Sequence, residues 1–500
     1  MADTGRLPLL RDPLLAVYAF VVLAFALPGR LILEPLGSVG NPAALAALAA
    51  AVAYALGRLA PGSLATGLQP VRTAVYLFAA GTVLAYAVGL ARPLLSYEAS
   101  SMDRTLIASV GFIGLALLTA DGVRSREHLE RLLKLLVLGG TFMAGLGIVQ
   151  FVTGARPQDY IAVPGLALQD VEINAERSFL TRVMGTAVHP IEYGVVLAVL
   201  LPVALHLATT SRTGVRPSRW WWVAVGVITV GIPMSISRSS ILGIAVGGAM
   251  MAVAWSWRRR WNLLAAGVLL LVAMRLAFPG LLGTLRSAFL FLGEDPSIEG
   301  RTQDYPLVWA YFVERPWLGR GLGTFPPEAY FFLDNEYLNR LLTGGVVGVA
   351  VLAVLLVVAM STGRGVYHHG VDPTSRSLGQ ALAASTAVSA VTWFTFDGLG
   401  FRMAAGVAFI LMGAAGALWR LEVGRPRWGE QLDRTRPELD LPPRERRPGP
   451  ITRWLARPDQ GDPALDEDRG SAPDLAPDSA RSSAPDSAPD VVPTGRGWTP

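Results

Sequence analysis

The sequence predicts an all-α polytopic membrane protein with about twelve transmembrane helices. Of its 500 residues, 52% are hydrophobic and only 16% are charged, whereas a soluble chain carries charge on about a quarter of its residues. The mean hydropathy is +0.42. The apolar residues form blocks long enough to cross a hydrocarbon core of about 30 Å, separated by short loops that contain arginine. Because no water satisfies the backbone at that depth, each block is expected to be a helix.

The apolar blocks define the expected spans. The first block contains Pro28 and Gly29 near its end and lacks a small-residue cleavage site, so it is expected to remain as a helix and not to be removed as a signal peptide. The chain has no cysteine, which excludes disulfides, thiolate metal sites and cysteine nucleophiles. The expected spans are Pro13–Ile32, Ala43–Leu59, Thr73–Ala91, Thr105–Ala120, Leu133–Val152, Pro190–Thr209, Trp220–Met234, Ser240–Trp257, Trp261–Phe278, Tyr337–Met360, Ser377–Phe396 and Met403–Trp419.

Positive charge in the short loops predicts the orientation. Loops rich in arginine and lysine, such as those with Arg124 or with Arg258–Arg260, alternate with poorer loops, such as those with Arg92 and Arg104 or with Arg402. The positive-inside rule places the richer loops in the cytoplasm. We therefore expect a multi-pass protein of the cell inner or plasma membrane with both termini cytoplasmic.

The chain is expected to divide into three parts. Residues 1–152 hold the first five helices, residues 153–420 form a core with helices 6–12, and residues 421–500 form a cytoplasmic tail. The core contains a long extracytoplasmic loop, 279–335, before the tenth helix, and a loop of this length is usually functional. The far half of the tail repeats Ser-Ala-Pro-Asp, which cannot build a core, so the tail is expected to be disordered.

Charged residues on the outer face are informative because burying them near a membrane is costly. Arg182 precedes His189 and Pro190, which fit the start of the sixth helix. Arg182 is either an anion contact or part of that helix entrance. Arg238 lies in a tight hairpin, Ser235–Ser239, on the outer side by parity, where its fork of donors suits phosphate. The alternative for Arg238 is a simple anchor at the membrane surface.

The long outer loop supplies two further arginines. Arg301 precedes a short helix expected from about Gln303 to Glu314, which Pro316 ends. Arg320 lies in a glycine-rich turn that lacks the preceding strand of a nucleotide-binding fingerprint. Both arginines could face a diphosphate, or both could simply be solvated.

Asp334 begins the segment Asp-Asn-Glu-Tyr that leads into the tenth helix. It could cap that helix, or it could act as a general base. The glycines that follow could permit close packing between helices. Several arginines and one carboxylate are thus expected on the outer face, without a cluster of metal ligands. This set indicates a phosphorylated, anionic substrate held by guanidinium groups, with no cofactor, metal or nucleic acid.

The order of these motifs resembles the O-antigen ligase/polymerase family of bacterial envelope proteins. The family signature is His-Asn, nine residues, then Gly-x-x-Gly. Asn335, Gly345 and Gly348 stand at the matching positions, and Asp334 replaces the histidine. The likeness covers roughly the middle third of the chain.

The resemblance implies a metal-independent, inverting glycan transfer on a GT-C-like scaffold. The donor would be a glycan on undecaprenyl diphosphate in the membrane lipid, and the acceptor a polysaccharide or lipid. Arg238 and Arg301 resemble the family arginines that hold the diphosphate, and Asp334 would take the role of the histidine that activates the acceptor hydroxyl. Further substrate-binding residues are expected at Arg182, His189, Arg320, Asn335 and Tyr337.

Two other classes remain open from the residues alone. A transporter or flippase of lipid-linked or anionic solutes would show charges near mid-membrane and inverted repeats, but Arg275 is the clearest such charge and no repeat is evident. A membrane scaffold with a working tail would leave the outer arginines without a purpose.

Overall fold

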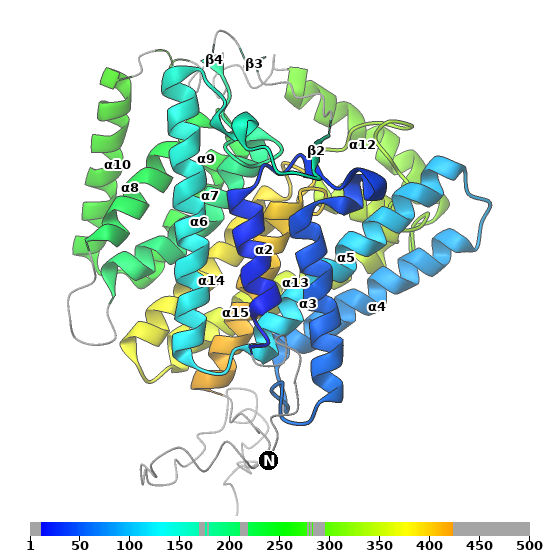
Figure 1. Ribbon diagram of the computed structural model, residues 1–500, viewed down its shortest axis with the longest axis horizontal. Coiled ribbons are helices and arrows are strands. Elements are labelled where there is room, and N and C mark those ends of the chain that lie inside the picture. Colours follow the sequence, from blue (N-terminus) through cyan, green and yellow to red (C-terminus); the bar gives the residue numbers. More distant parts are fainter. Residues whose placement is uncertain are drawn as a thin grey trace, which may run out of the picture. The chain divides into compact units, whose positions relative to one another are not determined.

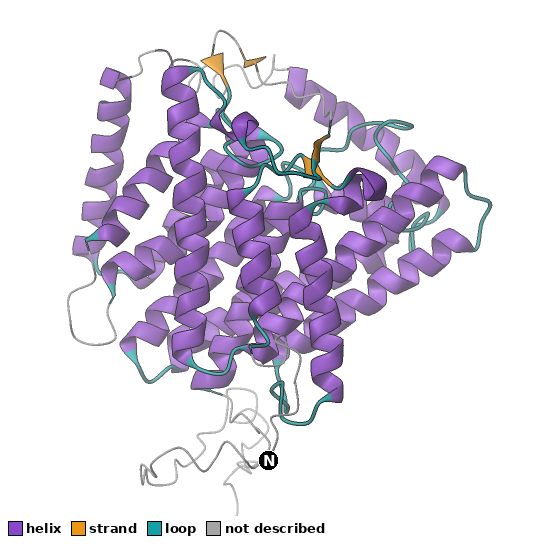
Figure 2. Cartoon of the chain, viewed as in Figure 1, coloured by secondary structure: helices purple, strands orange, loops and turns teal. Residues whose placement is uncertain are grey.

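A computed structural model describes residues 12–169, 176–177, 180–210, 219–277, 280, 283 and 296–423. Most of this part of the chain is helical, and each predicted span overlaps one of the helices (Figures 1 and 2). The helices are α2 (Leu15–Ala26), α3 (Pro42–Leu59), α4 (Pro70–Leu90), α5 (Ser96–Gly122), α6 (Arg126–Thr153), α7 (Pro190–Thr209), α8 (Trp220–Met234), α9 (Arg238–Ala254), α10 (Trp257–Ala277), α12 (Pro296–Glu314), α13 (Glu336–His369), α14 (Pro373–Thr392) and α15 (Arg402–Glu422).

The protein is an all-α, multi-pass membrane protein, as predicted. Eight helices in the described residues are long and apolar enough to cross a membrane, and α2, α8 and α9 are apolar but shorter. The predicted count of twelve crossings is therefore not established. The tail from residue 424 onward, expected to be disordered, lies outside the described residues, and the described helices belong to one compact unit, Met1–Thr435.

The end of the first predicted span was wrong. Helix α2 stops at Ala26 and not at Ile32, because Pro28 has no N–H to donate and cannot continue the helical hydrogen bonds. The chain then forms the short strand β1 (Leu31–Ile32), which pairs antiparallel with β2 (Ala167–Leu168). The remaining short elements are the 3₁₀ helices η1 (Glu34–Gly40) and η2 (Pro157–Tyr160) and the paired strands β3 (Glu176–Arg177) and β4 (Leu180–Thr181).

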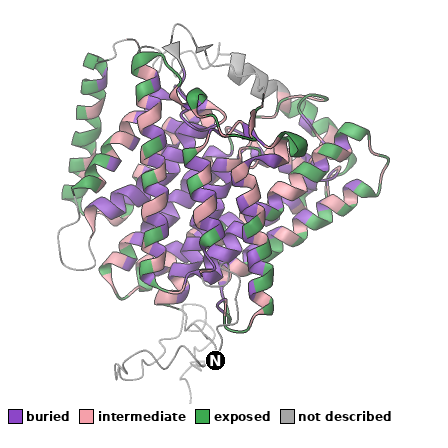
Figure 3. Cartoon of the chain, in the orientation of Figure 1, coloured by how far each residue is buried: buried purple, intermediate pink, exposed green. Residues whose placement is uncertain are grey.

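The core lies around α7 and α15, which are buried along almost their whole length, whereas α10 is exposed along almost its whole length (Figure 3). Helix α14 packs against α7, α9, α13 and α15. It carries several serines and threonines, and their buried hydroxyls bond inward, as when Ser385 Oγ donates to the Val199 carbonyl at 2.7 Å. Such bonds offset the cost of placing polar groups in an apolar core.

A buried ion-pair cluster joins three helices at one end of the bundle. Asp121, at the end of α5, is fully buried and accepts hydrogen bonds from Arg58 and from Arg72, which lie on α3 and α4. Arg420, near the end of α15, donates to the Ala120 carbonyl at 3.3 Å. These residues belong to loops or helix ends that the charge pattern assigns to the cytoplasm. The structure therefore brings these residues together at one end of the helix bundle. That this end faces the cytoplasm stays a prediction.

Helix α13 is broken near its start, and a glycine-rich turn docks into the break. Gly345 has φ 61°, a left-handed conformation that favours glycine. The Arg320 N–H donates to the Leu342 carbonyl at 2.9 Å, and the Val346 N–H donates to the Pro316 carbonyl at 2.8 Å. A Cβ atom on Gly345 would clash with the Trp317 carbonyl group. Gly345 here permits the close approach of a turn, whereas the sequence interpretation was close packing between helices.

Candidate functional site

The starts of four helices, α7, α9, α13 and α15, lie together at the end opposite the Asp121 cluster. Each helix start carries a partial positive charge from its unpaired N–H groups, which favours anions. Two starts are capped locally. His189 Nδ1 accepts the Ile191 N–H at 3.2 Å, and Asn335 Oδ1 accepts the Tyr337 N–H at 3.0 Å. The cap of α13 is thus Asn335, and the interpretation of Asp334 as that cap was wrong.

A buried carboxylate joins α7 to α15. Glu192 accepts the N–H groups of Met403 at 3.0 Å and Ala404 at 3.3 Å, and its other oxygen accepts the Val188 N–H at 2.9 Å. Glu192 therefore caps α15 from a neighbouring helix, in place of a local cap at Phe401. This contact fixes the two helix starts side by side.

The loop between α14 and α15 joins α13 to α9. The Glu336 N–H donates to the Trp393 carbonyl at 2.9 Å, and the Glu336 carboxylate accepts the Leu399 N–H at 3.0 Å. From the same loop, Thr395 Oγ1 donates to Ser239 Oγ at 2.8 Å. The loop therefore positions the start of α13, which follows Asp334, relative to the start of α9, which contains Arg238.

Arg182 holds the hairpin that precedes Arg238. The Arg182 side chain is 8% exposed, and its Nε donates to the Ser235 carbonyl at 3.2 Å. The hairpin itself lies as predicted, since α8 ends at Met234 and α9 begins at Arg238. At its apex Ile236 has φ 47°, which is strained for a β-branched residue. Such strain costs about 1–3 kcal/mol and is often found at functional sites.

His189 stays neutral at the centre of this arrangement. Burial lowers its pKa to about 4, the charge of Arg182 adds to that lowering, and the charge of Asp334 opposes it. Because Nδ1 accepts a hydrogen bond, we assign the ring proton to Nε2. His189 is therefore a neutral donor near one predicted anion contact, Arg182, and the predicted base, Asp334, whose side chain is exposed.

The structure places the other predicted site residues differently. The Arg320 guanidinium lies over the rings of Tyr311 and Phe325, 5.2 Å from each centroid, and 3.9 Å from the Glu98 carboxylate. Tyr337 stacks on Phe394, with centroids 4.0 Å apart, and its hydroxyl donates to the Ala390 carbonyl at 2.7 Å. Both side chains have packing roles here, and their predicted contacts with substrate stay predictions.

The pairing of Arg301 with Arg238 also stays a prediction. The backbone of Arg301 belongs to α12, but its side chain lies outside the described residues. Helix α12 ends at Glu314, as predicted, and begins at Pro296, before the expected Gln303.

Sequence reasoning missed a pair of carboxyl groups, Glu336 and Asp397. Glu336 is fully buried, and Arg340 Nε donates to it at 2.7 Å. Burial, and then the charge of Glu336 and a hydrogen bond with it, raise the pKa of Asp397 well above its usual value. Asp397 lies far from Glu336 in the sequence, so only a contact prediction could have found the pair.

Within the described ranges, no three His, Asp or Glu side chains are placed to hold a metal ion.

These features define the class of the protein: a multi-pass helical membrane protein with a polar site built from helix starts at one end of the bundle. Residues 223–353 match the family model described as O-antigen ligase. The match runs from α8 into α13 and contains Arg238, Arg301 and Asp334, whereas Arg182 and His189 precede it. The chain thus carries an O-antigen ligase-like segment, which confirms the resemblance predicted from the sequence. No curated protein matches the chain.

Proposed function

We propose that this protein transfers a glycan from undecaprenyl diphosphate to an acceptor hydroxyl on the extracytoplasmic face of the membrane. The O-antigen ligase segment supports glycan transfer as the class of reaction. The observation that supports the proposal is that the charges of Arg182 and Asp334 both act on His189, while Arg182 bonds to the Ser235 carbonyl in the hairpin before Arg238. This arrangement combines donors for an anion with an exposed carboxylate.

The positive groups would act on the leaving diphosphate. As the bond between the anomeric carbon and the phosphate oxygen breaks, its electron pair moves to that oxygen and negative charge grows there. Arg238, at the first position of α9, and Arg301 would stabilise this charge, since fixed donors act most strongly on charge that develops in the transition state. Arg182 would keep the hairpin in place, and the N–H of His189 would donate to a phosphate oxygen.

The exposed carboxylate would act on the acceptor. Asp334 would take the proton of the acceptor hydroxyl as its oxygen forms a bond to the anomeric carbon. Attack from the side opposite the diphosphate inverts the configuration at that carbon and requires both substrates to be held in line. In this mechanism the chain uses guanidinium groups and a carboxylate, and no metal ion takes part.

Reconstitution tests the proposal. The purified full chain in proteoliposomes, given an undecaprenyl-diphosphate-linked oligosaccharide and a polysaccharide or lipid acceptor, should release undecaprenyl diphosphate and extend the acceptor, with a chelator present. The alternative class, a transporter or flippase, predicts movement of the intact donor between leaflets with no new glycosidic bond. The candidate mid-membrane charge, Arg275, lies on the exposed surface of α10, which favours transfer over transport.

A further inference from the structure

Helix α12 carries a stripe of apolar side chains that no described part of the chain covers. Tyr305, Trp309 and Val313 follow one another at intervals of four residues, so they lie on one face of the helix. All three are exposed, and Trp309 is 63% exposed. Apolar surface of this kind is unfavourable in water, so we looked for what else covers the stripe.

The other sides of α12 have different surroundings. Val308, on the face next to the stripe, is buried, and α12 packs against α13 (Figure 1). Glu314 and Arg315 are exposed on a polar side at the end of the helix. The helix thus has one apolar face on the protein, one polar side and one uncovered apolar stripe. An amphipathic helix that lies in a membrane interface has this combination.

Hydrogen bonds hold the end of α12 beside the end of a spanning helix. The turn that follows α12 lies against α4, since the Leu322 N–H donates to the Ala85 carbonyl at 3.1 Å. Arg92 Nε, just after α4, donates to the Arg320 carbonyl in the same turn, also at 3.1 Å. Helix α4 is one of the eight candidate spans, and it ends at Leu90. The turn and the end of α12 are therefore held near the level where α4 leaves the membrane.

A further tryptophan is exposed at the same level. Trp317 lies in the turn and is 71% exposed. Its carbonyl accepts the Val347 N–H at 3.2 Å, so its backbone is fixed to α13. Tryptophan and tyrosine are enriched where hydrocarbon meets water, because their rings are apolar and carry one polar group. Trp317 and the stripe of α12 are thus side chains suited to that boundary.

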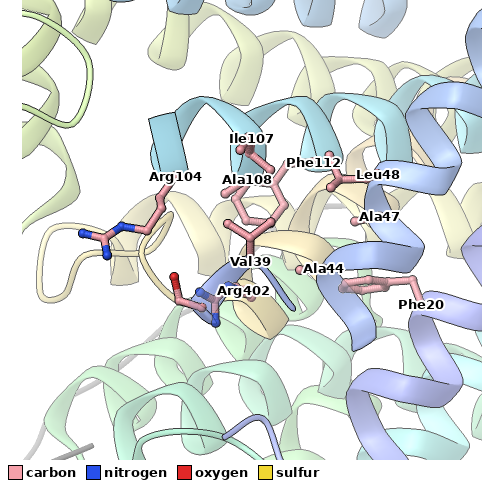
Figure 4. Close-up of a pocket in the computed structure, with 12 residues that line it drawn as sticks. Phe20, Val39, Ala44, Ala47, Leu48, Arg104, Ile107, Ala108, Phe112 and Arg402 are labelled. Carbon is pink, nitrogen blue, oxygen red and sulfur yellow. The ribbon is translucent and has the colours of Figure 1, made fainter. Parts of the chain in front are cut away.

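A glycan or a small apolar ligand fits the stripe less well than lipid does. A glycan needs hydrogen-bonding groups beside the aromatic rings, but the side chains beside Trp309 are those of Pro306, Ala310 and Val313. A small ligand needs a concave site. The pocket that Figure 4 shows belongs to other helices, contains no residue of α12 and has room for about two water molecules.

We propose that α12 is an in-plane membrane anchor. Its stripe of Tyr305, Trp309 and Val313 inserts among the acyl chains, close to the lipid headgroups, at the end of the bundle that carries the helix starts. The anchor holds α12 and the turn after it against the membrane surface. The stripe contacts bulk lipid and no bound substrate, so the anchoring does not depend on the proposed glycan transfer.

The absence of cysteine from the chain permits a test by labelling single sites. Trp309→Cys, Val313→Cys and Glu314→Cys are each labelled with a nitroxide, and the full chain is reconstituted in phosphatidylcholine bilayers. Electron paramagnetic resonance then measures collisions with oxygen, which concentrates in lipid, and with a water-soluble nickel complex. We expect the ratio of oxygen to nickel collisions to be several-fold higher at positions 309 and 313 than at position 314, the matched control on the polar side of the helix.

Two outcomes would overturn the proposal. Equal ratios at the three positions would show that the stripe faces water. Exclusion of both reagents from positions 309 and 313 would show that protein, such as a second copy of the chain, covers the stripe. Val313→Cys leaves every aromatic side chain in place, so it decides the question even where Trp309→Cys perturbs the helix. Because no glycan transfer is measured, a failure here leaves the proposed function to its own test.

Discussion

The carboxyl groups of Glu336 and Asp397 share a hydrogen bond at the start of α13. Glu336 also accepts from Arg340 and from the Leu399 N–H, so it ties the loop between α14 and α15 to α13. This joint lies directly after Asp334, the predicted base. The position of Asp334 therefore depends on a cluster of charged and polar groups that is itself sensitive to protonation.

The Asp397 proton gives the protein a pH-dependent stability. Because the pKa of Asp397 is raised in the folded state, the folded chain keeps a proton that the unfolded chain releases above about pH 4. The free energy of unfolding should therefore fall as pH rises from about 4 to the folded pKa. The unfolding temperature in detergent, measured across this pH range, should fall less steeply with pH for Asp397→Asn than for the wild type, because asparagine cannot ionise. An identical slope for both proteins would contradict the shared proton.

Loss of Glu336 should cost more than loss of Asp397. Glu336→Ala leaves Arg340, which is 7% exposed, without its carboxylate. Breaking a buried pair from one side costs about 3–5 kcal/mol. Denaturant unfolding of Glu336→Ala and of Glu336→Gln measures this, and the glutamine variant should recover part of the loss. If Glu336→Ala lowers the free energy of unfolding by less than about 1 kcal/mol, the pair behaves like a surface ion pair, and the description as a buried pair is rejected.

The proposed diphosphate contacts predict inactive variants that still fold. Arg238→Ala and Arg301→Ala should each abolish glycan transfer in membranes, a loss of at least about 10²–10³-fold, while expression stays normal. The measurement is product formation per folded molecule in proteoliposomes, with Arg315→Ala as the control. Wild-type product from either variant would remove that arginine from the diphosphate site.

The proposed base is tested by two substitutions at one position. Asp334→Asn should cost more activity than Asp334→His, because only the histidine can accept a proton, and loss of a general base costs about 10²–10⁴-fold. The cap of α13 is Asn335, so Asn335→Ala provides a comparison: it should destabilise the fold by about 1 kcal/mol. Full activity of both Asp334 variants would exclude it as the base.

Arg320 offers a test between packing and substrate binding. Its guanidinium lies over Tyr311 and Phe325 and near Glu98, and cation–π contacts are each worth about 0.5–2 kcal/mol, depending on their exposure to solvent. Arg320→Ala should therefore lower the unfolding temperature and leave the transfer rate per folded molecule unchanged. A lower rate with unchanged unfolding temperature would instead support the diphosphate contact predicted from the sequence.

Much of the fold follows from local chain properties. Apolar blocks of spanning length predicted helices at the right places, because a chain in hydrocarbon has to satisfy its backbone internally. Some helix ends were also predicted from local sequence: Pro316 follows α12, and the hairpin before Arg238 separates α8 from α9. The O-antigen ligase resemblance depended on residue order alone, and the family model confirms it over residues 223–353.

The sequence by itself determined the class of fold, the helix positions and the segment that resembles O-antigen ligases, since periodicity, turn residues and spacing act over short stretches of chain. Only the tertiary structure decided that Arg320 packs in an aromatic cluster, that Glu192 caps α15 and that Glu336 meets Asp397. These pairs are far apart in the sequence. Their contacts arise from how whole helices pack against one another, and no local pattern in the chain encodes that packing.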